Sequence, residues 1–312
     1  MTLRTNAKPM ICRATGRLSV RHALVLALVA CAGQRAPARS PLPSQPLLLE
    51  PGVVSTALPE FAITIAPDGR EMYFGRASAD RSALTIMMTE KTPAGWSAPR
   101  VAPFSGAYRD VDPFISPDGR RLYFSSDRPR ATSRVRTLST WYVERTSAGW
   151  GAPIDAGQPL NSDSLSVFVS QSRSGTLLFS SRRDGHMRVY ASKQEGARWG
   201  VPVPVSFGSI AEGVSNAVIS PSGRFVVLVL DVPNRRSDLF VSCRAGAGWS
   251  EPRPLREGVN SRYADFAPAI DPEETLLYFT SERPGIVAAR ADSVRPPGDI
   301  YQISLRAAGV SC

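Results

Sequence analysis

The sequence contains few of the residues on which metal sites and nucleophilic enzyme sites usually depend. Its 312 residues include two histidines, His22 and His186. His22 lies in a segment that we expect to be removed, and one remaining histidine cannot form a multi-histidine metal site. A Ser-His-Asp triad would have to use His186, which lies in the turn-like sequence RRDGHMR, and no GxSxG motif marks a hydrolase nucleophile. The sequence therefore argues against zinc enzymes and serine hydrolases.

The N-terminal region has no apolar run long enough to cross a membrane. The apolar stretch ALVLALVA at residues 23–30 follows a basic segment, and it is much shorter than the roughly 20 residues that a spanning helix needs. A basic segment, a short apolar run and a small residue in this order are typical of a secretory signal. The sequence therefore predicts an exported protein with a signal peptide at residues 1–30.

The end of this run, Leu28-Val29-Ala30-Cys31, resembles the lipobox of bacterial lipoproteins. The resemblance implies that the nucleophilic Cys31 thiol receives a diacylglycerol and becomes the first mature residue. Ala32, where an Asp would favour the inner membrane, then implies the outer membrane. The alternative is an ordinary signal peptide that contains a cysteine. Residues 31–50 are Pro-rich and are predicted to form an extended tether, so that the lipid alone attaches the protein to the membrane.

The remaining cysteines and the net charge fit an exported domain. In an oxidising compartment, Cys243 and Cys312 either form one disulfide or stay free thiols. The formal charge of +10 falls to +5 without the first 30 residues, which hold five of the 37 Lys and Arg residues and none of the 27 acids. No dense basic run with interleaved aromatic residues occurs, so we expect no nucleic-acid partner.

A sequence cassette that returns about every fifty residues predicts the fold. Apolar residues alternate within it as they do in strands, and the SPDG-type sequences suit type I turns with a left-handed exit. A unit of this size cannot bury its own apolar face and must stack on its neighbours. The cassettes are IAPDGREMYF at 65–74, ISPDGRRLYFSSDRP at 115–129, QSRSGTLLFSSRRDG at 171–185, ISPSGRFVVLVLD at 219–231 and IDPEETLLYFTSERPG at 270–285.

A second recurring element predicts how the array closes. A third strand follows each cassette, and a GW-x-x-P-type element that opens an outer strand follows four of them, at residues 95, 149, 198 and 248. The segment LLLEPGVVSTALPE at 47–60 has no cassette of its own and can supply the outer strand that the last repeat lacks. We therefore predict an all-β propeller at residues 51–312 with five four-stranded blades, closed by an N-terminal outer strand. The alternative is six blades.

The sequence ISPDGRRLYFSSDR at 115–128 and the strand that follows it resemble the TolB-type, WD-like β-propeller repeat of bacterial envelope proteins. The resemblance covers about residues 55–305 and is strongest in repeats two and five. Repeat three departs from it with Ser-Arg-Ser-Gly, and repeat five has Glu273-Glu274 where Asp-Gly is expected. The resemblance implies binding and scaffolding roles more often than catalysis.

Alignment of the repeats on their turns isolates three carboxylates. Glu60, Asp110 and Asp265 each lie six residues before the first turn residue, on the predicted innermost strand, where the other repeats have Ser166 and Val214. Such acids could converge at the channel mouth and bind a ligand or Ca²⁺, or act as the acid pair of a glycosidase. The structural alternative is that they cap turns or bind backbone amides between blades.

Three arginines, Arg128, Arg183 and Arg283, each follow a second strand. They could recognise carboxylate or phosphate ligands around one rim, or pair with the neighbouring acids Asp127, Asp184 and Glu282.

These observations predict a non-enzymatic binding or scaffold lipoprotein of the bacterial envelope, a monomer without a required cofactor. Its partner would be an envelope protein, peptide or glycan that binds at the channel mouth or at a rim. The alternative is a glycosidase-like, carbohydrate-active enzyme that uses the inner-strand carboxylates.

Overall fold

The computed structural model describes residues 41–196, 198–232, 236–286 and 296–312. The predicted signal peptide, Cys31 and the first part of the predicted tether lie outside these residues. Within the described ranges the chain forms strands and turns, and no helix there is long and apolar enough to span a membrane.

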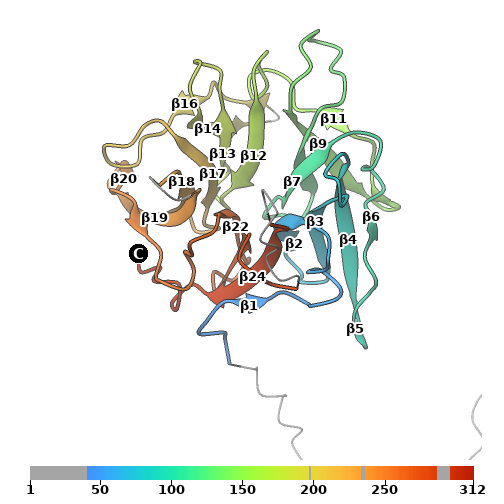
Figure 1. Ribbon diagram of the computed structural model, residues 1–312. Helices are drawn as coiled ribbons and strands as arrows, with labels where there is room; N and C mark the ends of the chain where they lie inside the picture. Colours follow the sequence, from blue (N-terminus) through green and yellow to red (C-terminus); the bar gives the residue numbers. More distant parts are fainter. Residues whose placement is uncertain (1–40, 197, 233–235, 287–295) are drawn as a thin grey trace, which may run out of the picture. The chain divides into compact units, whose positions relative to one another are not determined.

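The described strands form five antiparallel sheets arranged as the blades of a propeller (Figure 1). Each innermost strand contacts the next around the ring, and the last one contacts the first. The predicted five-bladed propeller is thus confirmed, and the six-bladed alternative is wrong. The innermost strands of blades 1 to 5 are β2 (Glu60–Ile65), β7 (Asp110–Ile115), β12 (Ser166–Gln171), β17 (Val214–Ile219) and β22 (Asp265–Ile270).

The second strands of the blades are buried at nearly every position rather than at every other one, because both of their faces pack against neighbouring blades. Their buried faces carry large apolar and aromatic side chains, which pack against the neighbouring blades. The second strands are β3 (Glu71–Ala77), β8 (Arg121–Ser126), β13 (Thr176–Ser181), β18 (Phe225–Leu230) and β23 (Leu276–Ser281). The third strands are β4 (Leu84–Thr92), β9 (Ser139–Thr146), β14 (Arg188–Glu195), β19 (Asp238–Ala245) and β24 (Asp299–Ser304).

The outer strand of blades 1 to 4 is split into two short segments, because a proline between them cannot donate to the ladder. The tryptophans of the first segments pack between blades, and the Trp150 indole donates to the Tyr73 hydroxyl of blade 1 at 2.6 Å. The first segments are β5 (Gly95–Trp96), β10 (Gly149–Trp150), β15 (Arg198–Trp199) and β20 (Gly248–Trp249). The second segments are β6 (Arg100–Val101), β11 (Ile154–Asp155), β16 (Val203–Pro204) and β21 (Arg253–Pro254).

The N-terminal segment closes the ring at blade 5. Strand β1 (Leu47–Leu48) pairs antiparallel with β24 and takes the place of the missing outer strand. This confirms the predicted closing piece, and residues 41–50 belong to the same compact unit as the propeller.

The cassette turns share one geometry, and the turn of repeat five has it too, although its sequence departs from the expected Asp-Gly. In blade 2, the Gly119 amide donates to the Ser116 carbonyl at 2.8 Å and Gly119 has φ 71°. In blade 5, Glu274 takes the glycine position with φ 56°, and its amide donates to the Asp271 carbonyl at 3.0 Å. The Asp271 carboxylate binds the backbone amides of the next strand, so the turn keeps its form without glycine.

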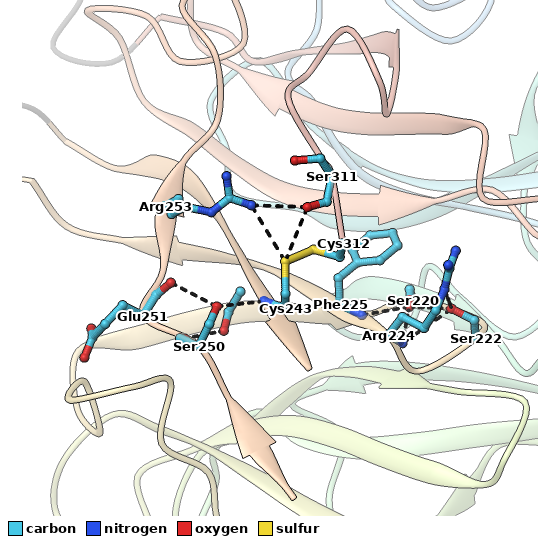
Figure 2. Close-up of a disulfide and its surroundings, with 11 residues drawn as sticks. Ser220, Ser222, Arg224, Phe225, Cys243, Ser250, Glu251, Arg253, Ser311 and Cys312 are labelled. Carbon is cyan, nitrogen blue, oxygen red and sulfur yellow. Dashed lines mark hydrogen bonds between the residues drawn. A yellow bond between two sulfur atoms is a disulfide. The ribbon is translucent and has the colours of Figure 1, made fainter. Parts of the chain in front are cut away.

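A disulfide fixes the C-terminal tail to blade 4. Of the two alternatives left by the sequence, the structure has the bond between Cys243, on β19, and Cys312, across 69 residues. Figure 2 shows it beside Arg253, which donates to the Ser311 carbonyl at 3.5 Å. The tail also packs Leu305 and Ala308 into the apolar core that blades 4 and 5 share. Both chain ends of the ring are therefore tied to blades 4 and 5.

Replacing both cysteines, in Cys243→Ser with Cys312→Ser, should lower the free energy of unfolding by about 2–4 kcal/mol, because the bond restricts a long loop of the unfolded chain. Urea unfolding of the oxidised protein and the double variant measures this. Adding reductant should destabilise the natural protein and leave the variant unchanged. Equal unfolding midpoints of the oxidised protein and the variant would show that the tail is held without the bond.

Candidate functional site

The three carboxylates singled out by the repeats lie at the first position of their innermost strands, and their side chains have 0% exposure. Glu60 accepts hydrogen bonds from the Thr56 amide and hydroxyl, at 2.9 and 2.5 Å. Asp265 accepts from the Ser261 amide and hydroxyl in the same way, at 2.6 and 2.8 Å. Burial raises the pKa of Glu60, although bonds from Thr56 and Arg76 oppose this. These acids hold the turns that lead into their strands.

Each of these acids also forms a buried ion pair with an arginine of its own blade. Arg128 donates to Asp110 at 2.8 Å and Arg283 donates to Asp265 at 2.9 Å. In blade 1, Arg76 on β3 takes this role and donates to Glu60 at 2.8 Å. The carboxylate oxygens are thus already bound within the blades.

The pairing predicted between these arginines and their sequence neighbours is wrong. Asp127 accepts from the Arg109 amide, Asp184 from the Tyr190 hydroxyl and Glu282 from Arg236. Arg183, whose blade has Ser166 at the acid position, donates to the carbonyls of Pro159 and Leu160 at 3.2 and 2.6 Å. The register of the strands decides these partners. Asp110 lies opposite Ser126 on the neighbouring strand, and Arg128 follows Ser126 by two residues, so that its side chain reaches Asp110.

Blade 4 shows that the acid and the arginine form a structural unit. It has Val214 at the acid position and Val232 at the arginine position, so that both members of the pair are replaced by apolar residues. In the described part of the chain, no group of three or more His, Cys, Asp or Glu residues could hold a metal ion.

The innermost strands share a second feature, which the alignment of acids did not reveal. The third residue of every innermost strand has a left-handed backbone, and the pairing register shifts at each of these positions. A bulge of this kind takes the residue out of the ladder, and three of these residues, Ala62, Asp112 and Phe168, line a small cavity on the channel axis. The five axial residues are Ala62 (φ 46°), Asp112 (φ 54°), Phe168 (φ 54°), Asn216 (φ 43°) and Ala267 (φ 46°).

A funnel of about 310 Å³ opens on the axis where the cassette turns of the five blades meet. Its wall is mostly apolar and includes Ile65, Phe114, Val218 and Ile270, and turn prolines from four blades surround its mouth. Blade 3 is the exception, because the departing sequence Ser-Arg-Ser-Gly places Arg173 in the ring of prolines. Its guanidinium donates to the Pro272 carbonyl of blade 5, and its amide donates to the Pro221 carbonyl at 2.9 Å.

A polar groove of about 590 Å³ continues from the funnel between blades 2 and 3. The two share Pro117, Gln171 and Arg173. Within the described residues, Arg120 and Arg173 of this groove have no carboxylate within ion-pairing distance, whereas Arg121 pairs with Glu144 at 3.0 Å. The groove can therefore offer hydrogen-bond donors to an extended ligand.

A small cavity of about 30 Å³ lies at the inner end of the axis, and Asp112 is among the residues that line it. It shares Thr64, Phe114, Val218 and Ile270 with the funnel. Asp112 is the one charged residue that lines it, and burial raises the pKa of this carboxyl to about 6, against a weak bond from Ser125 at 3.4 Å. The channel axis thus holds a carboxylate whose negative charge is stabilised by one weak hydrogen bond from the described residues.

Comparison with known proteins shows the fold and leaves the activity open. No protein-family model and no curated protein matches the chain. A putative TolB from Agrobacterium tumefaciens is 16% identical, with a TM-score of 0.51 over 82% of this chain and 80% of that one. A glycoside hydrolase is 10% identical, with a TM-score of 0.51 over 85% of this chain and 91% of that one. At such identities the similarity shows a shared β-propeller architecture.

Asp110→Ala should lower the free energy of unfolding by about 3–5 kcal/mol, because it leaves the buried Arg128 guanidinium without its carboxylate. The double variant Asp110→Val with Arg128→Val reproduces the blade 4 pair and should lose less than half as much. Urea unfolding of Asp110→Val, Arg128→Val and the double variant measures the coupling between the two residues.

The exposed pair of Arg121 and Glu144 provides the control, since Glu144→Ala should cost less than about 1 kcal/mol. If Asp110→Ala is no more costly than this control, the buried pair does not hold the inner strand.

Proposed function

We propose that this protein is an exported, lipid-anchored binding module of the bacterial envelope whose partner enters the axial funnel from the side of the cassette turns. The observation that carries the proposal is the funnel itself: four blades contribute its apolar wall, blade 3 contributes Gln171 and Arg173, and Glu273 lies near its mouth. Concave apolar surfaces with a few convergent polar groups are typical of ligand sites.

A peptide segment of an envelope protein suits this funnel better than a glycan. Aliphatic and aromatic side chains of a peptide can bury apolar area against Phe114 and Val218, and the groove beyond Arg173 can follow the extended backbone with donors for its carbonyls. A glycan would leave most of its hydroxyl groups without partners on the apolar wall.

The alternative, a glycosidase that uses Glu60, Asp110 and Asp265, finds no support in the site. Two of these acids bind arginines on the loops that follow β8 and β23, the third binds Arg76, and all three side chains are fully buried. A glycosidase acid must reach the scissile bond of its substrate. We therefore propose a binding role without catalysis.

The proposed export and anchoring depend on residues 1–31, and the similarity to a putative TolB agrees with an envelope protein. The test is metabolic labelling with a palmitate analogue in a Gram-negative host. The natural protein should be labelled and Cys31→Ser should not, while both retain the propeller. Equal labelling of Cys31→Ser would contradict the anchor.

The binding surface can be tested by site-specific photo-crosslinking in intact cells. A photoreactive amino acid at Glu273, which is exposed at the funnel mouth, should capture a discrete partner. The matched control is Val201, which is 82% exposed on the outer edge of blade 3 between β15 and β16. Capture at position 201 without capture at position 273 would place the partner elsewhere. Mass spectrometry of the captured species distinguishes a protein from a glycan, and a glycan would refute the peptide partner.

A further inference from the structure

The axial residues differ in one respect that the repeat does not require. Three of the five blades place Ala62, Phe168 and Ala267 at this position, and all three belong to one buried apolar cluster. Blade 4 places a neutral Asn216 there, and blade 2 places Asp112. A carboxylate is thus unnecessary for the bulge itself, since alanine adopts the same backbone in two blades.

The Asp112 carboxyl lacks the compensation that the other inner-strand acids have. Among the described residues, its carboxyl accepts one hydrogen bond, from the Ser125 hydroxyl at 3.4 Å. This hydroxyl also accepts a hydrogen bond from the Phe168 amide at 3.3 Å. No arginine, lysine or histidine among the described residues lies within ion-pairing distance of Asp112, whereas Asp110, two residues earlier, binds Arg128 at 2.8 Å. Asp112 is half-buried, and a charge that is partly withdrawn from water without a charged partner favours a ligand that supplies one.

The cavity beside Asp112 restricts the size of that partner group. Its volume of about 30 Å³ suits one water molecule or an ammonium group, and a planar guanidinium is larger. A bare divalent cation such as Ca²⁺ needs several oxygen ligands, whereas the lining consists of Asp112, Thr64 and apolar residues.

We propose that the axial funnel binds a primary ammonium group of the partner peptide, which forms an ion pair with Asp112. The group is either a lysine side chain, whose methylene stem would pack on the apolar wall, or a free peptide N-terminus. Arg173 at the mouth donates to carbonyls such as that of Pro272, so it suits the backbone of the same peptide. This inference rests on the proposed function and names the group by which the partner is recognised.

The first test uses n-butylamine as the probe, with n-butanol and n-butylguanidine as matched compounds. Binding is followed by NMR of the isotope-labelled carboxyl carbon of Asp112 and by calorimetry. The amine should bind at least about 10-fold more tightly than either matched compound. Equal affinities for the amine and the alcohol would overturn the proposal.

The variant Asp112→Asn removes the charge and keeps the backbone, because Asn216 already adopts this conformation in blade 4. It should lower the calorimetric affinity for n-butylamine by about 10- to 30-fold, to the level of n-butanol. Asn216→Ala is the control at the same axial position: Asn216 does not line the cavity, alanine has precedents there, and affinity should stay unchanged. An Asp112→Asn variant that binds the amine like the natural protein would refute the ion pair.

Two peptides distinguish the sources of the ammonium group. One is acetyl-Gly-Lys-Gly-amide, whose ammonium is on the side chain, and the other is Gly-Lys-Gly-amide with an acetylated side chain and a free N-terminus. Binding of either one that depends on Asp112 supports the proposal and identifies the source, and binding of neither refutes it. Crosslinking at position 273 does not require Asp112, so capture there without amine binding would refute this inference alone.

Discussion

The left-handed backbone at the third residue of each innermost strand is the constraint on which the ring and its axis depend. It frees amides from the ladder, and two of them bond to the neighbouring blade: Ala62 donates to the Thr280 hydroxyl at 3.1 Å and Phe168 donates to the Ser125 hydroxyl at 3.3 Å. A left-handed residue other than glycine costs roughly 1–2 kcal/mol. The ring accepts this cost in every blade because the bulge joins the blades and sets the lining of the channel.

Two kinds of carboxylate follow from this arrangement. Two residues before the bulge, an acid such as Asp110 is buried within its own blade, where Arg128 neutralises its charge. At the bulge, the Asp112 side chain leaves the blade and lines the axial cavity, where no such arginine lies within reach among the described residues. The first kind stabilises the fold, and the second leaves an uncompensated charge at the end of an open funnel. This difference is why we assign recognition to Asp112 and structure to Asp110.

Local patterns made the blades predictable, whereas the site depends on register. The alternating cassettes and the turn sequences identify strands that lie close together in the sequence. The count of outer-strand elements located the segment that closes the ring. The partner of Arg128 could not be found in this way, because Asp110 lies 18 residues earlier and meets it only through the pairing of β7 with β8. Asp112 was missed because the alignment compared acids that recur, and Asp112 matters because it does not recur. Aligning the strands two residues further would have shown it.

The central claim is that Asp112 carries a charge that the folded protein leaves largely uncompensated. The most direct measurement is an NMR titration of its carboxyl carbon in the folded protein. We expect a pKa of about 6, because burial disfavours the charged form of the carboxyl. The pKa of this carboxyl is near 3.8 in the unfolded chain and higher in the folded protein. The free energy of unfolding should therefore fall as the pH rises from 3.8 through 6, because ionisation of Asp112 then disfavours the folded state. A pKa at or below 3.8 would show that the carboxylate is already well solvated or paired, and would contradict the account.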